Sequence, residues 1–178
     1  MLKKPALVLS LLLVAMMTLP CQAQSASEQE KNKAVARTFI EEVIGQGKLE
    51  EYSDFHTADF VGHGSEHDFT LAEDLAAAQE ERKALPDLQV AISHIVAEGD
   101  LVVVHWTMRA TNTQPGMGLP ATGKPIRLSG MTLFRFKSGK IAEEWGGFSM
   151  LSVLKQLGLL CTGQEPKLPS HDPTNPRR

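Results

Sequence analysis

Two side chains of this sequence, His63 and Glu143, have types and surroundings that suit acid/base chemistry. His63 lies between two glycines, where it could bind a carbonyl group or pass on a proton, or bond only to the backbone of its own loop. Glu143 and Trp145 share one face of a predicted strand, and Glu144 takes the other face. A glutamate beside a tryptophan in apolar surroundings has a raised pKa and can act as a base. The competing interpretation is an ion pair between Glu143 and an arginine such as Arg127 or Arg135.

A second set of polar side chains alternates along the predicted strand 101–111. His105 and Arg109 are four residues apart and share a face with Thr107. If that face lines the interior, the set forms an anion or enolate site. If it faces outward, the set belongs to a dimer interface or a solvated surface. The opposite face carries residues typical of a core, namely Val102, Val104, Trp106 and Met108.

Residues 54–68 form an acidic stretch that contains three histidines, His56, His63 and His67. Their spacing matches no standard zinc pattern, so we expect a solvated loop and no metal. The sequence also has no phosphate-binding glycine loop, no G-x-S-x-G motif and no Cys/His nucleophile pair. We therefore expect a protein that works without a cofactor.

The order of the predicted elements indicates an α+β fold. Apolar residues recur at helical spacing from Ala34 to Ile44, and a short helix is expected over about 48–55. Thr70 and Glu73 form a capping-box pattern that opens a helix through about Leu85. From Leu88 onward the period becomes two, with hairpin turns at 98–100 and 138–139. Helices followed by antiparallel strands predict helices on one face of a curved sheet.

The N-terminus has the pattern of a secretory signal. Lys3 and Lys4 precede an apolar run, and Cys21-Gln22-Ala23 has small residues where a signal peptidase cuts. The run is too short for a membrane span of about 20 residues. Acylation at Cys21 is the lipoprotein alternative, although the two residues before it fit poorly. We expect residues 1–23 to be a signal peptide and the protein to be periplasmic or secreted.

The rest of the chain divides into a polar spacer at 24–31, a folded domain at 32–160 and a proline-rich disordered tail at 161–178. The net charge of −3 becomes −5 when the two signal-peptide lysines are removed, because no acid is lost with them. An acidic chain of this kind does not carry the basic footprint of a nucleic-acid-binding protein. Cys161 is the one cysteine of the mature chain, so it packs as an apolar residue or pairs between chains.

Four segments carry a family resemblance: FVGHG around His63, LPDLQVAISHIVAEGDLVVVHWTMRAT from Leu85 to Thr111, GLPATGKPI from Gly118 to Ile126, and GKIAEEW from Gly139 to Trp145. Together they resemble the SnoaL-like polyketide cyclase or ester cyclase family over nearly the whole mature domain. The resemblance implies the cone-shaped α+β barrel of nuclear transport factor two. It also implies a pocket between helices and sheet, and a homodimer.

The resemblance directs attention to two further positions. In characterised cyclases of this family, an aspartate four residues after the strand tryptophan acts as the acid/base group, and here that position is Ser149. A Gly-Thr-His pattern after the third strand corresponds here to Ala110-Thr111-Asn112. Both positions therefore depart from the family pattern.

Two functional hypotheses remain open. In the first, the protein is an exported enzyme that rearranges a small apolar carbonyl compound by proton transfer, without metal or cofactor. His63, His105, Glu143 and Ser149 are its catalytic candidates, and Arg109, Asn112 and Trp145 its ligand-binding candidates. In the second, the protein is a non-catalytic small-ligand-binding or dimeric interaction module, because Ser149 and Asn112 remove the expected chemistry.

Overall fold

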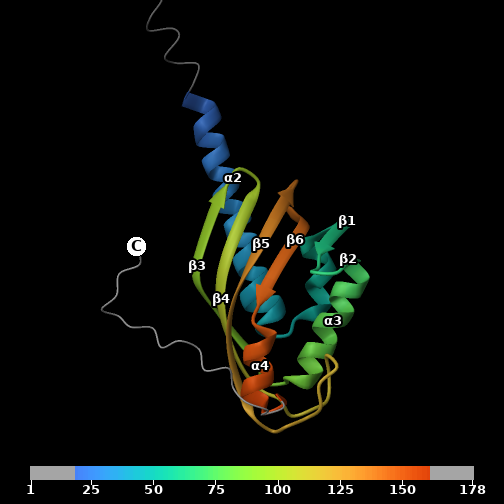
Figure 1. Cartoon of the computed structure of the whole chain (residues 1–178). Helices are drawn as coiled ribbons and strands as arrows, with labels where there is room; N and C mark the ends of the chain where they lie inside the picture. The colour runs from blue at the N-terminus through green and yellow to red at the C-terminus, as the bar shows by residue number, and fades with distance from the viewer. Residues whose placement is uncertain (1–18, 161–178) are drawn as a thin grey trace, which may run out of the picture.

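The computed structural model describes residues 19–160, in which helices pack against a curved mixed sheet (Figure 1). The strands are β1 (His56–His63), β2 (Asp68–Thr70), β3 (Gln89–Glu98), β4 (Leu101–Thr111), β5 (Pro125–Lys137) and β6 (Lys140–Phe148). Their order in the sheet is β2-β1-β6-β5-β4-β3, and only β1 and β6 pair in parallel. The predicted α+β class is confirmed. The sheet is left open, because β2 and β3 both lie at edges.

The helical segments are α2 (Leu19–Thr38), the π-helical η1 (Phe39–Ile44), the 3-10 segment η2 (Leu49–Phe55), α3 (Leu71–Ala84) and α4 (Met150–Leu157). The first helix starts earlier than the expected Ala34, and it includes the residues predicted as a spacer. Apolar periodicity could not reveal this half of α2, since residues 26–31 are mostly exposed. The predicted signal peptide at 1–23 lies outside the described residues up to residue 18, and its last five residues, 19–23, form the start of α2. The predicted tail at 161–178 lies outside the described residues.

Several local predictions are confirmed. Thr70 caps α3 with a full capping box, in which its side chain accepts from the Glu73 N–H and the Glu73 carboxylate accepts from the Thr70 N–H. The turns at Gly99 and Gly139 have positive φ, as tight hairpins require. Among the described helices, none combines the length and the apolar character needed to span a membrane.

The alternation of β5 shows how the sheet divides into two faces. Its even-numbered residues from 126 to 136 are buried, and most of its odd-numbered residues are exposed. Phe134 and Phe136 join Phe39 and Val43 of η1 in one core cluster, so this face lies under the helices. We call it the inner face and the opposite side the outer face.

The helix α4 covers the other end of the inner face. Val153 and Leu157 pack with Ile126 and Leu128 of β5 and with Leu85 after α3, forming a second core cluster. Trp106 contacts both clusters. Figure 1 shows α4 at the lower end of the sheet, and its apolar side chains fill the inner face there.

Gly130 is a position where close approach requires glycine. It lies opposite Trp106 in the register, and a Cβ added there would lie 2.4 Å from Cζ2 of the indole ring. Gly147 offers a contrast, because a Cβ there would meet nothing within 4 Å.

We predict that Gly130→Val lowers the free energy of unfolding by about 1–3 kcal/mol, because the indole must move out of its place in the core. Urea denaturation measures this change. Gly147→Val is the matched control and should change stability by less than about 0.5 kcal/mol. Equal effects of the two substitutions would contradict the packing described for Trp106.

Candidate functional site

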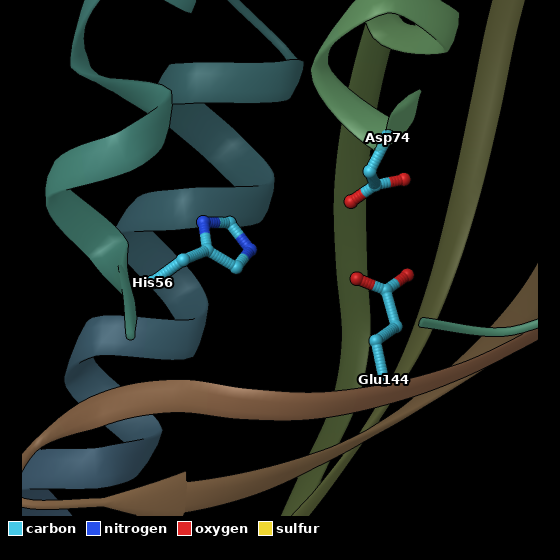
Figure 2. Close-up of side chains that lie close together, drawn as sticks. All are labelled: His56, Asp74 and Glu144. Carbon is cyan, nitrogen blue, oxygen red and sulfur yellow. The ribbon is translucent and has the colours of Figure 1, made fainter. Parts of the chain in front are cut away.

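Four polar side chains from four segments meet inside the aromatic part of the core. They are Tyr52 from η2, His56 at the start of β1, Asp74 from α3 and Glu144 from β6, and we call them the inner polar group. His56, Asp74 and Glu144 each place one nitrogen or oxygen atom within 4.8 Å of the other two (Figure 2). The His56 ring is only 2% exposed and stacks on the Tyr52 ring at 4.9 Å.

Hydrogen bonds fix the orientation of two members of the group. The Tyr52 hydroxyl donates to Oδ2 of Asp74 at 2.6 Å. Nδ1 of His56 lies 2.8 Å from the Tyr52 carbonyl oxygen, which can only accept, so Nδ1 carries the proton. Nε2 of His56 then presents a lone pair, and this buried atom has no hydrogen-bond partner within residues 19–160.

A β-bulge places Glu144 on the inner face. Phe136 pairs with Ile141 and Arg135 pairs with Glu143, so Ala142 is an extra residue on β6. Ile141 and Glu144 therefore both face inward, and Glu144 lies opposite the fully buried Phe134. Glu143 faces outward opposite Arg135.

Burial governs the protonation of the inner polar group. Loss of solvent, with a smaller contribution from the neighbouring Asp74 charge, raises the pKa of Glu144 to about 8. Burial also raises the pKa of Asp74, against the hydrogen bond from Tyr52 that lowers it. The same desolvation lowers the pKa of His56 to about 4, so its imidazole is neutral near pH 7. Negative charge is thus costly here unless something positive accompanies it.

The outer face carries a different cluster, formed by three residues singled out in the sequence and their neighbours. His63 stacks on Trp145 at 4.4 Å, and its Nε2 lies 3.0 Å from Oε2 of Glu143. Nδ1 of His63 lies 3.0 Å from Oδ1 of Asp68. The hydrogen bond with Glu143 is the main cause that raises the pKa of His63.

Glu143 also forms an ion pair with Arg135, at 2.9 Å between Oε1 and Nε. His63, Glu143 and Trp145 therefore lie together on the outer face, opposite the helices, and their catalytic and ligand-binding roles stay predictions. The competing interpretation of Glu143 as a member of an ion pair matches the structure.

His105 and Arg109 also lie on the outer face of β4. His105 contacts the hydroxyl of Ser93 through Nδ1 at 3.0 Å, and Arg109 donates to the side-chain oxygen of Gln89 at 2.6 and 2.8 Å. Two open hollows of about 480 and 430 Å³ share Gln89, Arg109 and Arg127 in their linings. No member of the inner polar group lines either hollow, so these hollows are separate from the buried ionisable groups.

The model of the family described as SnoaL-like polyketide cyclase matches residues 34–157, which is more than half of the chain. The chain belongs to this SnoaL-like family. No curated protein was found to match the sequence.

Solved structures of similar proteins support the same fold. AclR from Streptomyces galilaeus, named as a candidate hydroxylase, is 26% identical with a TM-score of 0.69, over 75% of this chain and 99% of that one. IdmH from Streptomyces antibioticus, a candidate polyketide cyclase, is 26% identical with a TM-score of 0.62, over 71% and 98%. A candidate polyketide cyclase from Acidithiobacillus ferrooxidans is 27% identical with a TM-score of 0.63, over 72% and 95%.

The two positions where this SnoaL-like chain departs from the family pattern have structural partners. Ser149 is the N-cap of α4, and its Oγ accepts a hydrogen bond from the Ser152 N–H at 3.2 Å. Asn112 is 2% exposed, and its Oδ1 accepts from both the backbone and the hydroxyl of Thr122. Neither residue bonds to the inner polar group in the part of the chain that the structure describes, and their catalytic roles stay predictions.

Sequence reasoning missed the inner polar group. His56 was placed in a solvated acidic stretch, whereas it is buried at the first residue of β1. Asp74 attracted no attention, although it follows directly on the Thr70–Glu73 capping box and so lies in the first turn of α3. The sequence signal for this group was the pair of adjacent glutamates, Glu143 and Glu144. Adjacent residues of a strand point to opposite faces, so one of the two had to face the helices.

We predict that Glu144→Gln stabilises the protein, and that the gain depends on pH. The Glu144 pKa of about 8 is above its ordinary 4.5, so the folded state holds this proton more tightly than the unfolded state. Stability from this group is full below about pH 4.5 and is lost as pH rises toward 8. The Gln variant escapes that loss, and its advantage should reach the order of 2 kcal/mol at pH 8 and vanish near pH 4.

Chemical denaturation at several pH values, with EDTA present, measures this difference. Glu143→Gln is the control, because that carboxylate lies on the outer face beside Arg135. A Glu144→Gln advantage that does not change with pH would contradict the burial of this carboxyl group.

Proposed function

We propose that this SnoaL-like protein binds a small, largely apolar carbonyl compound on the inner face and rearranges it there. The observation that carries the proposal is the inner polar group itself. Two half-buried carboxyl groups and a buried imidazole nitrogen, which has no hydrogen-bond partner among the described residues, weaken the fold when they are held together among aromatic rings. A binding or reaction site is the main reason for a protein to keep such an arrangement.

The surroundings of Glu144 provide room for a ligand. Gly146 follows Glu144 on the inner face, where it pairs with Thr132. A Cβ at Gly146 would have a single neighbour within 4 Å, Oε1 of Glu144 at 3.6 Å. Trp106 and Phe148 lie on the same face beside this space, with ring centroids 6.4 Å apart. Two aromatic surfaces with a polar inner end suit an apolar compound that carries a carbonyl group.

The reaction class follows from this placement together with the family. A carbonyl held at the inner end would lie beside Glu144, whose raised pKa keeps its carboxyl group protonated near neutral pH. During ring closure or isomerisation, the Asp74 carboxylate would take the proton from the carbon next to the carbonyl, and the Glu144 carboxyl would donate a hydrogen bond to the oxygen as it gains enolate charge. Such an enolate needs positioned groups that stabilise its charge. The similarity to AclR and IdmH, named as a candidate hydroxylase and a candidate polyketide cyclase, supports chemistry on compounds of this kind.

A second candidate function is binding without turnover, as a ligand-binding or dimeric interaction module. Ser149 and Asn112 favour it, because both side chains form structural hydrogen bonds. Ser149 caps α4, and Asn112 accepts from the backbone of Thr122. It would use the same inner-face space. The two functions differ only in whether the ligand leaves unchanged.

We also infer that the protein acts outside the cytoplasm, which rests on the signal pattern of residues 1–23. Mass spectrometry of the exported protein should then find a chain that starts at Gln24. The homodimer remains a prediction from the family resemblance.

We predict that Gly146→Val weakens ligand retention at least tenfold, because its side chain occupies the space beside Glu144. Native mass spectrometry of the mature protein, first as purified and then with a panel of small aromatic ketones, measures retention and any change in ligand mass. A ligand that leaves with a changed structure supports the enzyme, and one that leaves unchanged supports the binding module.

Gly147→Val is the matched control, since residue 147 faces outward and has open space around it. Far-UV circular dichroism shows whether both variants fold. Retention by folded Gly146→Val at the wild-type level would contradict an inner-face ligand site.

A further inference from the structure

We propose that His56, Asp74 and Glu144 bind one divalent transition-metal cation, Zn²⁺ or Mn²⁺, through one atom each. The sequence led us to expect no metal, because the spacing of His56, His63 and His67 matches no standard zinc pattern. The structure brings the three proposed ligands together from β1, α3 and β6, with the ligand atoms within 4.8 Å of one another. Small side-chain rotations bring atoms at such separations to about 2.0–2.2 Å from one cation.

The orientation of His56 is the first argument. Its Nδ1–H donates to the Tyr52 carbonyl at 2.8 Å, which fixes the tautomer and leaves the Nε2 lone pair free. Metal-binding histidines commonly hold their second nitrogen in this way. Nε2 is buried without a hydrogen-bond partner, and the ring points toward the two carboxylates (Figure 2).

The charge balance of the site is the second argument. The Nε2 lone pair of His56 and the carboxyl groups of Asp74 and Glu144 all attract positive charge, and they face one another. Among the described side chains, only Tyr52 donates a hydrogen bond to either carboxyl group. No lysine or arginine forms a salt bridge with Asp74 or Glu144 among the described pairs. A divalent cation would satisfy the lone pair and both carboxylates at once.

The ligand types indicate which cation fits. One imidazole nitrogen and two carboxylate oxygens suit Zn²⁺ or Mn²⁺ better than Mg²⁺ or Ca²⁺, which prefer all-oxygen sites. Three protein ligands leave a position open for water or substrate. Tyr52 would act from the outer shell, since its hydroxyl orients Asp74.

The outer-face cluster of His63, Asp68 and Glu143 provides a natural comparison. It also joins a histidine to two carboxylates, but each ring nitrogen already has a carboxylate partner at 3.0 Å. Arg135 further neutralises Glu143. This cluster therefore has no free ligand atom directed at a common point.

The inference rests on the geometry of the inner polar group and stands apart from the proposed reaction. If the reaction is also correct, the cation would lie at the inner end of the ligand space and could polarise the carbonyl group. Metal binding can be measured without any ligand or turnover, so the two proposals can fail separately.

The test uses the untagged mature protein, stripped with EDTA, dialysed, and titrated calorimetrically with Zn²⁺ and separately with Mn²⁺. We expect one cation per chain and a rise in the melting temperature with cation concentration. Glu144→Gln and Asp74→Asn should weaken binding at least a hundredfold, and His56→Phe should do the same while keeping an aromatic ring in its place. Tyr52→Phe should weaken binding about tenfold, as outer-shell changes do.

Glu143→Gln is the matched control and should bind the cation as the wild type does. Circular dichroism establishes which variants fold. If His56→Phe does not fold, the binding affinity of Glu144→Gln alone decides the test. The proposal is overturned if neither cation binds stoichiometrically. It is equally overturned if Glu144→Gln leaves binding unchanged, or if Glu143→Gln abolishes it.

Discussion

The extra residue that Ala142 inserts into β6 is the constraint on which the site depends. In an undisturbed strand, residues alternate between faces, so the buried Ile141 would bring Glu143 and Trp145 inward with it. The bulge breaks that alternation between the Arg135 and Phe136 pairings. It turns Glu144 toward the helices and sends Glu143 to the outer face. Bulges often re-aim side chains next to functional sites in this way.

The inward orientation of Glu144 changes the energetics of the site as well as its geometry. Glu144 arrives opposite Phe134 and close to Asp74, in a place where both carboxyl groups lose solvent. Both acquire a raised pKa, and His56 a lowered one. The outer cluster pairs its histidine with carboxylates and adds an arginine, so each charge there has a partner. Among the described side chains, Asp74 of the inner polar group receives one hydrogen bond from Tyr52, and neither Asp74 nor Glu144 pairs with a basic side chain. This incomplete compensation is the physical reason to propose it as the functional site.

Much of the fold followed from local patterns in the sequence. The capping box at Thr70, the hairpin at Gly99, the two faces of β4 and the α+β class all rest on interactions between residues near each other in the chain. Such features can be predicted from sequence because they depend on the spacing of residues that are near each other in the chain. The family resemblance also agrees with the match of the SnoaL-like model over residues 34–157.

The site could not be predicted in the same way. A bulge has no reliable signature in a run such as KIAEEW, so strict alternation favoured Glu143 over Glu144. His56 and Asp74 are 18 positions apart in the chain, and Asp74 and Glu144 are 70 apart. The order of the strands and the packing of α3 on the sheet bring them together. Metal-ligand motifs in a sequence are recognised by short spacing, so a set of ligands this far apart leaves no such motif.

The central claim is that the protein works on its inner face. The chain has two tryptophans, Trp106 on the inner face and Trp145 on the outer face, so their indole N–H signals report on the two faces separately. We would record ¹⁵N–¹H spectra of the mature protein while adding a small aromatic ketone that it retains, assigning the signals with Trp145→Phe. The account predicts that the Trp106 signal shifts and the Trp145 signal stays. A shift confined to Trp145 would contradict it and place the ligand beside His63 and Glu143.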